Sequence, residues 1–169
     1  AAQMQLLASI YNGNLASVWR YVPWPSAGDD TLAWLKKSLV SGKIEKGDFL
    51  YQGVLFDTPQ RPPSTMQMHF RVKDALLDYA PNWPVLSNLN ADIDIYNRRL
   101  SISAKSGRIY QSAARDIVAE IPDLNTPILQ LNAGIDTVGD DLIRLFTETP
   151  LKEDVAHFAE MISIKGEIA

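Results

Sequence analysis

The segment Met66-Gln67-Met68-His69-Phe70-Arg71-Val72-Lys73 alternates apolar and polar side chains without a break. Successive side chains of a β-strand point to opposite faces, so this period of two predicts a strand with one apolar and one polar face. The same alternation recurs over Ala91–Tyr96 and Leu100–Lys105. Only Asn97-Arg98-Arg99 separates these two segments, which predicts a tight turn and an antiparallel hairpin.

Further strands are predicted on both sides of this hairpin, with short connections that favour a meander. The candidates are Asp48–Phe56, Arg108–Gln111, Asp116–Ile121, Ile128–Ile135 and Met161–Ile168. Helices are predicted at both ends, over Met4–Tyr11, Leu15–Val22, Asp29–Gly42, Asp140–Thr147 and Leu151–Ala159. The sequence thus predicts an α+β fold, mainly β, with an open and mostly antiparallel sheet of about eight strands.

The change of period near Lys43 predicts two parts, a helical N-terminal segment over 1–42 and a β unit over 43–169. The chain opens on an uncharged helical pattern and stops at Lys165-Gly166-Glu167-Ile168-Ala169, inside a predicted strand. We therefore expect a fragment of a longer protein, with the β unit truncated at its C-terminal end.

Composition excludes several classes of function. The 169 residues include 16 Lys and Arg against 20 Asp and Glu, a net charge of −4, with no basic stripe, so nucleic acid is not an expected partner. The absence of cysteine excludes disulfides, thiol chemistry and cysteine-based zinc sites. No apolar run reaches the roughly eighteen residues that a membrane-spanning helix needs.

Residues that could carry chemistry are few and scattered. His69 lies on the polar side of its strand and His157 in a polar segment, and neither accompanies a nucleophile motif. Asp92 and Asp94 share one face of a strand, but a solvated strand face explains them better than a cation site or an acid–base pair. We expect no enzyme activity, no catalytic residue, no metal and no cofactor.

Trp83 stands between Asn82 and Pro84 in a proline-rich turn. A Trp in this setting packs at the edge of a sheet more often than it stacks on a sugar. The sugar alternative stays open as a carbohydrate-binding module that would combine Trp83 with the Asp92/Asp94 pair.

Several local patterns, each weak alone, occur together over about residues 30–168. They are Leu32-Ala33-Trp34-Leu35, Gly42–Phe49, Tyr51-Gln52-Gly53, Met68–Ala75, Tyr79–Leu86, Gly107-Arg108-Ile109, Ala119–Leu124, Gly134 and Leu142–Leu151. In this order they resemble the AsmA-like domain of the YhdP family of bacterial envelope proteins. The resemblance implies a curved sheet with an apolar groove, in a large periplasmic protein that an N-terminal helix of the parent chain anchors in the inner membrane of a Gram-negative bacterium.

The resemblance also implies transport of phospholipid between inner and outer membrane, with neighbouring β units of the parent chain as further partners. Burial of acyl chains on the apolar side of the sheet would need no chemistry. The groove candidates are Met66, Met68, Phe70, Val72, Ile93, Ile95, Leu100 and Ile102. The main alternative is a structural spacer of the envelope, in which the chain's own helices cover these residues.

Overall fold

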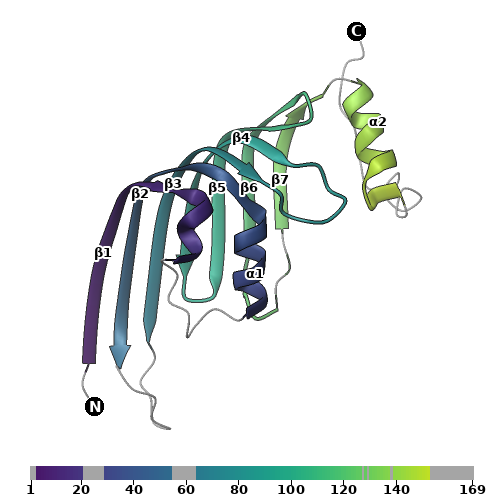
Figure 1. Ribbon diagram of the computed structural model, residues 1–169. Helices are drawn as coiled ribbons and strands as arrows, with labels where there is room; N and C mark the ends of the chain where they lie inside the picture. The colour runs from purple at the N-terminus through teal and green to yellow at the C-terminus, as the bar shows by residue number, and fades with distance from the viewer. Residues whose placement is uncertain are drawn as a thin grey trace.

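Seven strands and three short helical segments make up the part of the chain that the computed structural model describes, which is residues 3–20, 29–54, 64–126, 128, 130–137 and 139–152 (Figure 1). In chain order the elements are β1 (Gln3–Asn14), the 3₁₀ helix η1 (Leu15–Arg20), α1 (Asp29–Ser38), β2 (Leu39–Val54), β3 (Thr65–Leu77), β4 (Leu86–Tyr96), β5 (Arg99–Ile109), β6 (Ser112–Ile121), β7 (Gln130–Asp136) and α2 (Gly139–Glu148).

The strands form one open sheet in sequence order, β1 to β7, and each is antiparallel to the next. This confirms the predicted mainly β fold with a curved antiparallel sheet, with seven described strands against about eight expected. The predicted hairpin is β4–β5, with Asn97 and Arg98 in the turn. The candidate strand Met161–Ile168 lies outside the described residues.

The strand expected over Arg108–Gln111 is wrong. Arg108 and Ile109 end β5, and Tyr110 and Gln111 form the turn to β6. Tyr110 has a left-handed backbone with φ of 53°, a conformation of turns and not of strands.

The helix expected over Met4–Tyr11 is also wrong, because these residues belong to β1. Apolar neighbours such as Leu6 and Leu7 satisfy a helical period as well as a strand period, so the pattern alone was ambiguous. Pairing with β2 decides the outcome, since it gives the backbone of β1 hydrogen-bond partners from Gln3 to Asn14. The boundary proposed at residue 42 falls inside β2, and the division into two parts stays a prediction.

The next two predicted helices form, with different bounds. Leu15–Arg20 is a 3₁₀ helix, which begins where the Asn14 side chain accepts a hydrogen bond from the Ala16 amide at 3.0 Å. The helix α1 ends at Ser38 and not at Gly42, which lies in β2 with φ of +139°. A Cβ at Gly42 would lie 2.9 Å from the Ala75 Cα, so glycine lets β2 approach β3 here.

A line of left-handed residues crosses the sheet and accompanies its bend. Asp74, Asn88 and Asp116 each have φ of 50° and lie at register shifts in the β3–β4, β4–β5 and β6–β7 pairings. Such bulges bend a strand and increase its twist. Figure 1 shows the resulting curvature, with η1 and α1 on the inner side of the bend.

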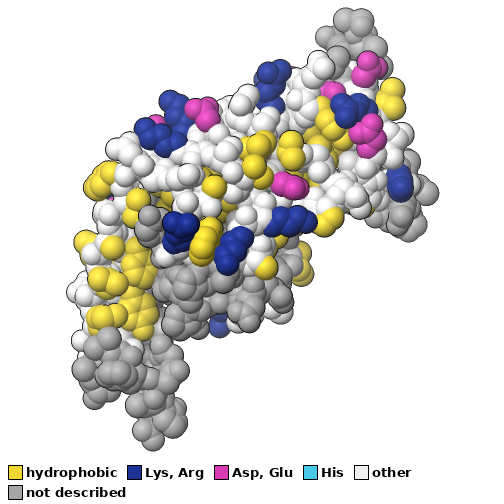
Figure 2. Space-filling view, viewed as in Figure 1, with side chains coloured by type: hydrophobic (Ala, Val, Ile, Leu, Met, Phe, Trp, Pro, Cys, Tyr) yellow, Lys and Arg dark blue, Asp and Glu magenta, His cyan; other side chains and the backbone are white. Residues whose placement is uncertain are grey.

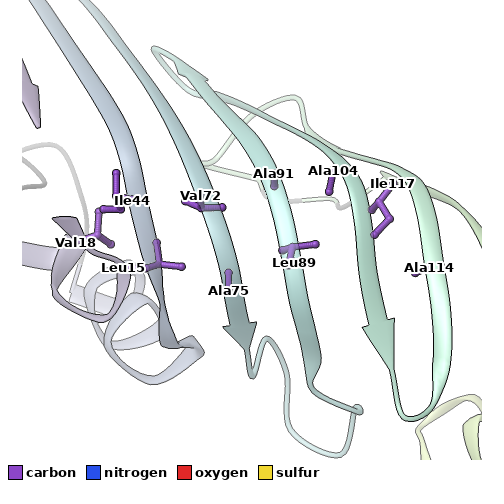
Figure 3. Packing of buried hydrophobic residues seen from close by; sticks show 10 residues of the cluster. All are labelled: Leu15, Val18, Ile44, Val72, Ala75, Leu89, Ala91, Ala104, Ala114 and Ile117. Carbon is purple, nitrogen blue, oxygen red and sulfur yellow. The ribbon is translucent and has the colours of Figure 1, made fainter. Parts of the chain in front are cut away.

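The core lies between η1 and the inner face of the sheet (Figure 3). Leu15 and Val18 of η1 belong to one buried cluster with residues from β2 to β6, namely Ile44, Val72, Ala75, Leu89, Ala91, Ala104, Ala114 and Ile117. The core therefore occupies one end of the strands and does not extend along their whole length.

The C-terminal described segment confirms the predicted helix near Asp140–Thr147, which is α2. Leu151 and Lys152 are helical too, and the rest of the helix predicted over Leu151–Ala159 lies outside the described residues. Among the helices in the described part of the chain, none combines the length and the apolar composition that crossing a bilayer requires.

Candidate functional site: the apolar face of the sheet

The strand register brings the predicted apolar residues of β3, β4 and β5 to one face. Met68 pairs with Ile95, which pairs with Leu100, and Phe70 pairs with Ile93, which pairs with Ile102. Directly paired residues of neighbouring strands point to the same side, so six of the predicted groove residues form two parallel rows. Met66 and Val72 extend the same face along β3, because they lie two residues before Met68 and two after Phe70.

The rows continue on both sides of the predicted residues. Phe49 of β2 pairs with Met68 and with Ala8 of β1, and Ile121 of β6 pairs with Leu100. The sequence-based list missed these strands, although Leu6, Ala8 and Ile10 already show the spacing of two that would have placed β1 on this face. The apolar face therefore extends over the whole width of the described sheet.

The eight predicted residues differ in how far the chain itself buries them. Val72 is 2% exposed and belongs to the core under η1. Phe70, Ile93 and Ile102 are half-buried and pack against the edge of that core. Met66, Ile95 and Leu100 are half-buried and lie outside the core, as does Met68, which is 5% exposed.

Beyond the core the face carries large apolar side chains that remain in contact with solvent. Leu6 of β1 is 45% exposed and Leu131 of β7 is 64% exposed. Figure 2 shows hydrophobic side chains gathered over the first strands on this side of the molecule. In the described part of the chain, the face is thus covered at the η1 end and partly open at the other end.

The opposite face of the same strands is polar and carries ion pairs. His69 Nδ1 lies 2.8 Å from Asp94 Oδ1, and Arg71 Nε donates to Asp92 Oδ1 at 2.9 Å. Asp48 accepts hydrogen bonds from Lys46 and Ser9, which hold the pKa of its carboxyl below the ordinary value. Exposed pairs of this kind contribute little to stability.

The residues of the carbohydrate alternative have structural partners. Asp92 accepts a hydrogen bond from Arg71 and Asp94 lies in hydrogen-bond contact with His69, both of β3, while Trp83 packs against Tyr79 with ring centroids 6.2 Å apart. Trp34 of α1 donates a hydrogen bond to the Tyr79 carbonyl at 2.9 Å, which ties this loop to the helix. No described contact joins Trp83 to either carboxylate, and no group of His, Asp or Glu in the described residues is arranged to hold a metal ion.

His157, the other histidine, lies outside the described residues. One hollow of about 270 Å³ lies on the outer face and is lined mainly by polar and charged residues, among them Arg71, Lys73, Asp92 and Lys105. An apolar ligand therefore has its best match on the inner face, where the predicted residues lie.

The family model described as "YhdP protein" matches residues 1–169, the full chain. The chain belongs to the YhdP family. The intermembrane phospholipid transporter YhdP of Escherichia coli (strain K12) is 25% identical to this YhdP-family chain over 168 residues, which cover 96% of the chain and 13% of that transporter. No solved structure matches the chain.

Proposed function

We propose that the apolar face shelters the acyl chains of a phospholipid while the lipid moves between two membranes. The observation that carries this proposal is the set of continuous apolar rows across the sheet, where Met66, Ile95 and Leu100 lie outside the core and are only half-buried. A second support is the relative from Escherichia coli, which is named an intermembrane phospholipid transporter. The chain corresponds to a small part of that protein, so transport by the whole assembly is part of the proposal.

The dimensions of the sheet suit a lipid. Seven strands at a spacing of about 4.8 Å give a width of about 29 Å, whereas the acyl chains of one leaflet span about 15 Å. Each Å² of apolar surface removed from water contributes about 25 cal/mol, so a few hundred Å² of acyl chain gain several kcal/mol. Because this attraction is non-directional, a row of similar side chains offers many positions of similar energy, which favours movement along the face.

In this proposal no bond of the lipid is made or broken, and the protein acts as a carrier and not as an enzyme. The described sheet is too narrow to connect two membranes alone, so neighbouring β units of a longer chain continue the apolar face. The site of action is the periplasm, between the inner and outer membranes, with the membrane anchor elsewhere in the parent protein.

A charged substitution on the apolar face tests the proposal. Ile95→Asp places a carboxylate in the uncovered part, where burial of an unpaired charge against acyl chains is costly. Val118→Asp is the matched control, because Val118 is exposed on the other face, in register with Ser103 of β5. We expect uptake of a fluorescent phospholipid by the chain to fall at least tenfold for Ile95→Asp and to remain for Val118→Asp.

Circular dichroism and thermal unfolding of both variants verify that the sheet still forms. Equal uptake by Ile95→Asp and wild type would contradict the assignment of this face. A wild-type chain that binds no phospholipid at all would instead favour the structural spacer.

A further inference from the structure

Three exposed basic residues lie on the two helical segments of the inner side. Arg20 ends η1, and Lys36 and Lys37 lie in the last turn of α1. We call them the basic cluster. Within the described residues, six basic side chains pair with carboxylates, and the three residues of the basic cluster are among the eight that do not. The cluster is therefore a place where positive charge lacks a described carboxylate partner.

The Trp19 ring contacts two of these three basic side chains. Lys36 Nζ lies 4.4 Å from the centroid of the Trp19 ring, and Arg20 Cζ lies 5.2 Å from it. The aromatic ring attracts each cation, and the two like charges that it gathers repel each other. Lysines in the last turn of a helix complement its dipole, which accounts for Lys36 and Lys37 but not for Arg20 on a different element. An anion in contact with both side chains would relieve this repulsion.

The cluster adjoins the apolar face. Leu15 and Val18 of η1 are buried in the core against the sheet, and Trp19 and Arg20 follow directly in the same segment. Figure 2 shows Lys and Arg side chains across the middle of this side, to the right of the hydrophobic patch over the first strands. The helix η1, which covers one end of the apolar face, therefore also places the positive charge of Arg20 beside that face.

We propose that Arg20 and Lys36 bind the phosphate of a phospholipid headgroup whose acyl chains lie on the uncovered part of the apolar face. This inference rests on the proposed function. A guanidinium matches two phosphate oxygens at once and an ammonium adds a point charge, while the headgroup stays at the solvated rim, where its charge is not buried. Charge complementarity favours a phosphate at the basic cluster. The chain as a whole has a net charge of −4, so an anionic lipid would be repelled without a local positive charge.

The test compares ligands that share either the tails or the phosphate. Binding to the 169-residue chain is measured for phosphatidylglycerol with a fluorescent acyl chain, for diacylglycerol with the same labelled chain, and for glycerol phosphate as a competitor. The variant is Arg20→Gln with Lys36→Gln. The matched control is Lys73→Gln with Lys105→Gln, which removes the same charge from the outer face, where both lysines line the polar hollow.

We expect the double variant to bind phosphatidylglycerol about three- to tenfold more weakly than wild type, the size expected for two exposed charge contacts. Diacylglycerol binding should be unchanged in both variants, and the control should bind both lipids like wild type. Added salt should reduce the difference in wild-type affinity between phosphatidylglycerol and diacylglycerol.

Each other outcome has a distinct meaning. Unchanged binding of phosphatidylglycerol by the double variant overturns the headgroup site and leaves the proposed function standing. Equal weakening in the outer-face control also overturns it, because general charge then explains the effect. Glycerol phosphate that competes as well as the intact lipid identifies a site for free anions and overturns the headgroup assignment. A wild-type chain that binds neither lipid overturns the proposed function and this inference together.

Discussion

The buried carboxylate of Asp141 accepts a hydrogen bond from the Ser112 hydroxyl at 2.7 Å and thereby joins α2 to the first residue of β6. The same Oδ2 atom accepts the backbone amide of Gln111 at 2.9 Å. Nearby, the Arg144 guanidinium lies 4.0 Å from the centroid of the Tyr110 ring, and burial raises the pKa of the Tyr110 hydroxyl. The β5–β6 turn is therefore the place where α2 is attached to the sheet.

Replacing Asp141 should loosen this attachment. Asp141→Ala leaves the Gln111 amide without its acceptor, at a cost of about 1–3 kcal/mol. Hydrogen exchange should speed up in α2 and in the β5–β6 turn and stay unchanged in β1 to β4. Asp140→Ala is the control, because Asp140 is exposed in the same helical turn. If hydrogen exchange in α2 is equally slow in both variants, contacts other than those of Asp141 attach the helix to the sheet.

Gly42 should tolerate no side chain. Gly42→Ala combines φ of +139° with a Cβ that would lie 2.9 Å from the Ala75 backbone and 3.1 Å from Leu15 Cδ2, and should cost about 1–3 kcal/mol in the free energy of unfolding. Gly139→Ala is the control, because its Cβ would meet nothing within 4 Å. Urea unfolding of the two variants makes the comparison, and equal midpoints would argue against a constrained Gly42.

The bulge at Asp74 should reject a β-branched residue although its side chain is exposed. Asp74→Val forces valine into a left-handed backbone with φ of 50°, at a cost of about 1–2 kcal/mol. Asp74→Gly should be tolerated, and Lys73→Val, at the exposed position just before it, should have little effect. Thermal unfolding would show the order of stability, and an Asp74→Val variant as stable as the Asp74→Gly variant would contradict a fixed bulge.

Asp48 should make part of the stability dependent on pH. Hydrogen bonds from Lys46 and Ser9 lower the pKa of its carboxyl, so its contribution is present above the unfolded value of 3.8 and is lost as the pH falls through the lower folded value. Asp48→Asn should therefore destabilise the chain most well above pH 3.8, with a difference that shrinks in stronger acid. Urea unfolding across this range tests it, with Asp140→Asn as a control; a difference that is constant with pH would contradict the assignment.

The sequence predicts the centre of the sheet well, because β3, β4 and β5 alternate cleanly and the β4–β5 turn is short. It predicts the shared face of the eight groove candidates for the same reason, while their role in lipid binding stays a prediction. The prediction failed for β1, because Leu6-Leu7 fits the helical period as well as the strand period. Only the pairing with β2 determines that this segment is a strand. The prediction also failed to anticipate the bulges, because Asp74, Asn88 and Asp116 look like ordinary polar-face residues until their register is known.

The partial burial of the groove candidates could not be predicted either. Val72 and Met66 belong to the same alternating strand, yet η1 covers only the first of them. That difference depends on where Leu15 and Val18 dock, which is a contact between segments far apart in the sequence.

The simple strand order has a consequence for how this chain acquires its shape. Every strand after η1 and α1 adds to the edge left by its immediate predecessor, so no pairing waits for a distant segment. A chain that emerges gradually, from a ribosome or through a narrow pore, can therefore assemble its sheet stepwise from the leading end, with short loop closures at each step. The same rule lets a longer chain lengthen its sheet without rearranging the strands already in place.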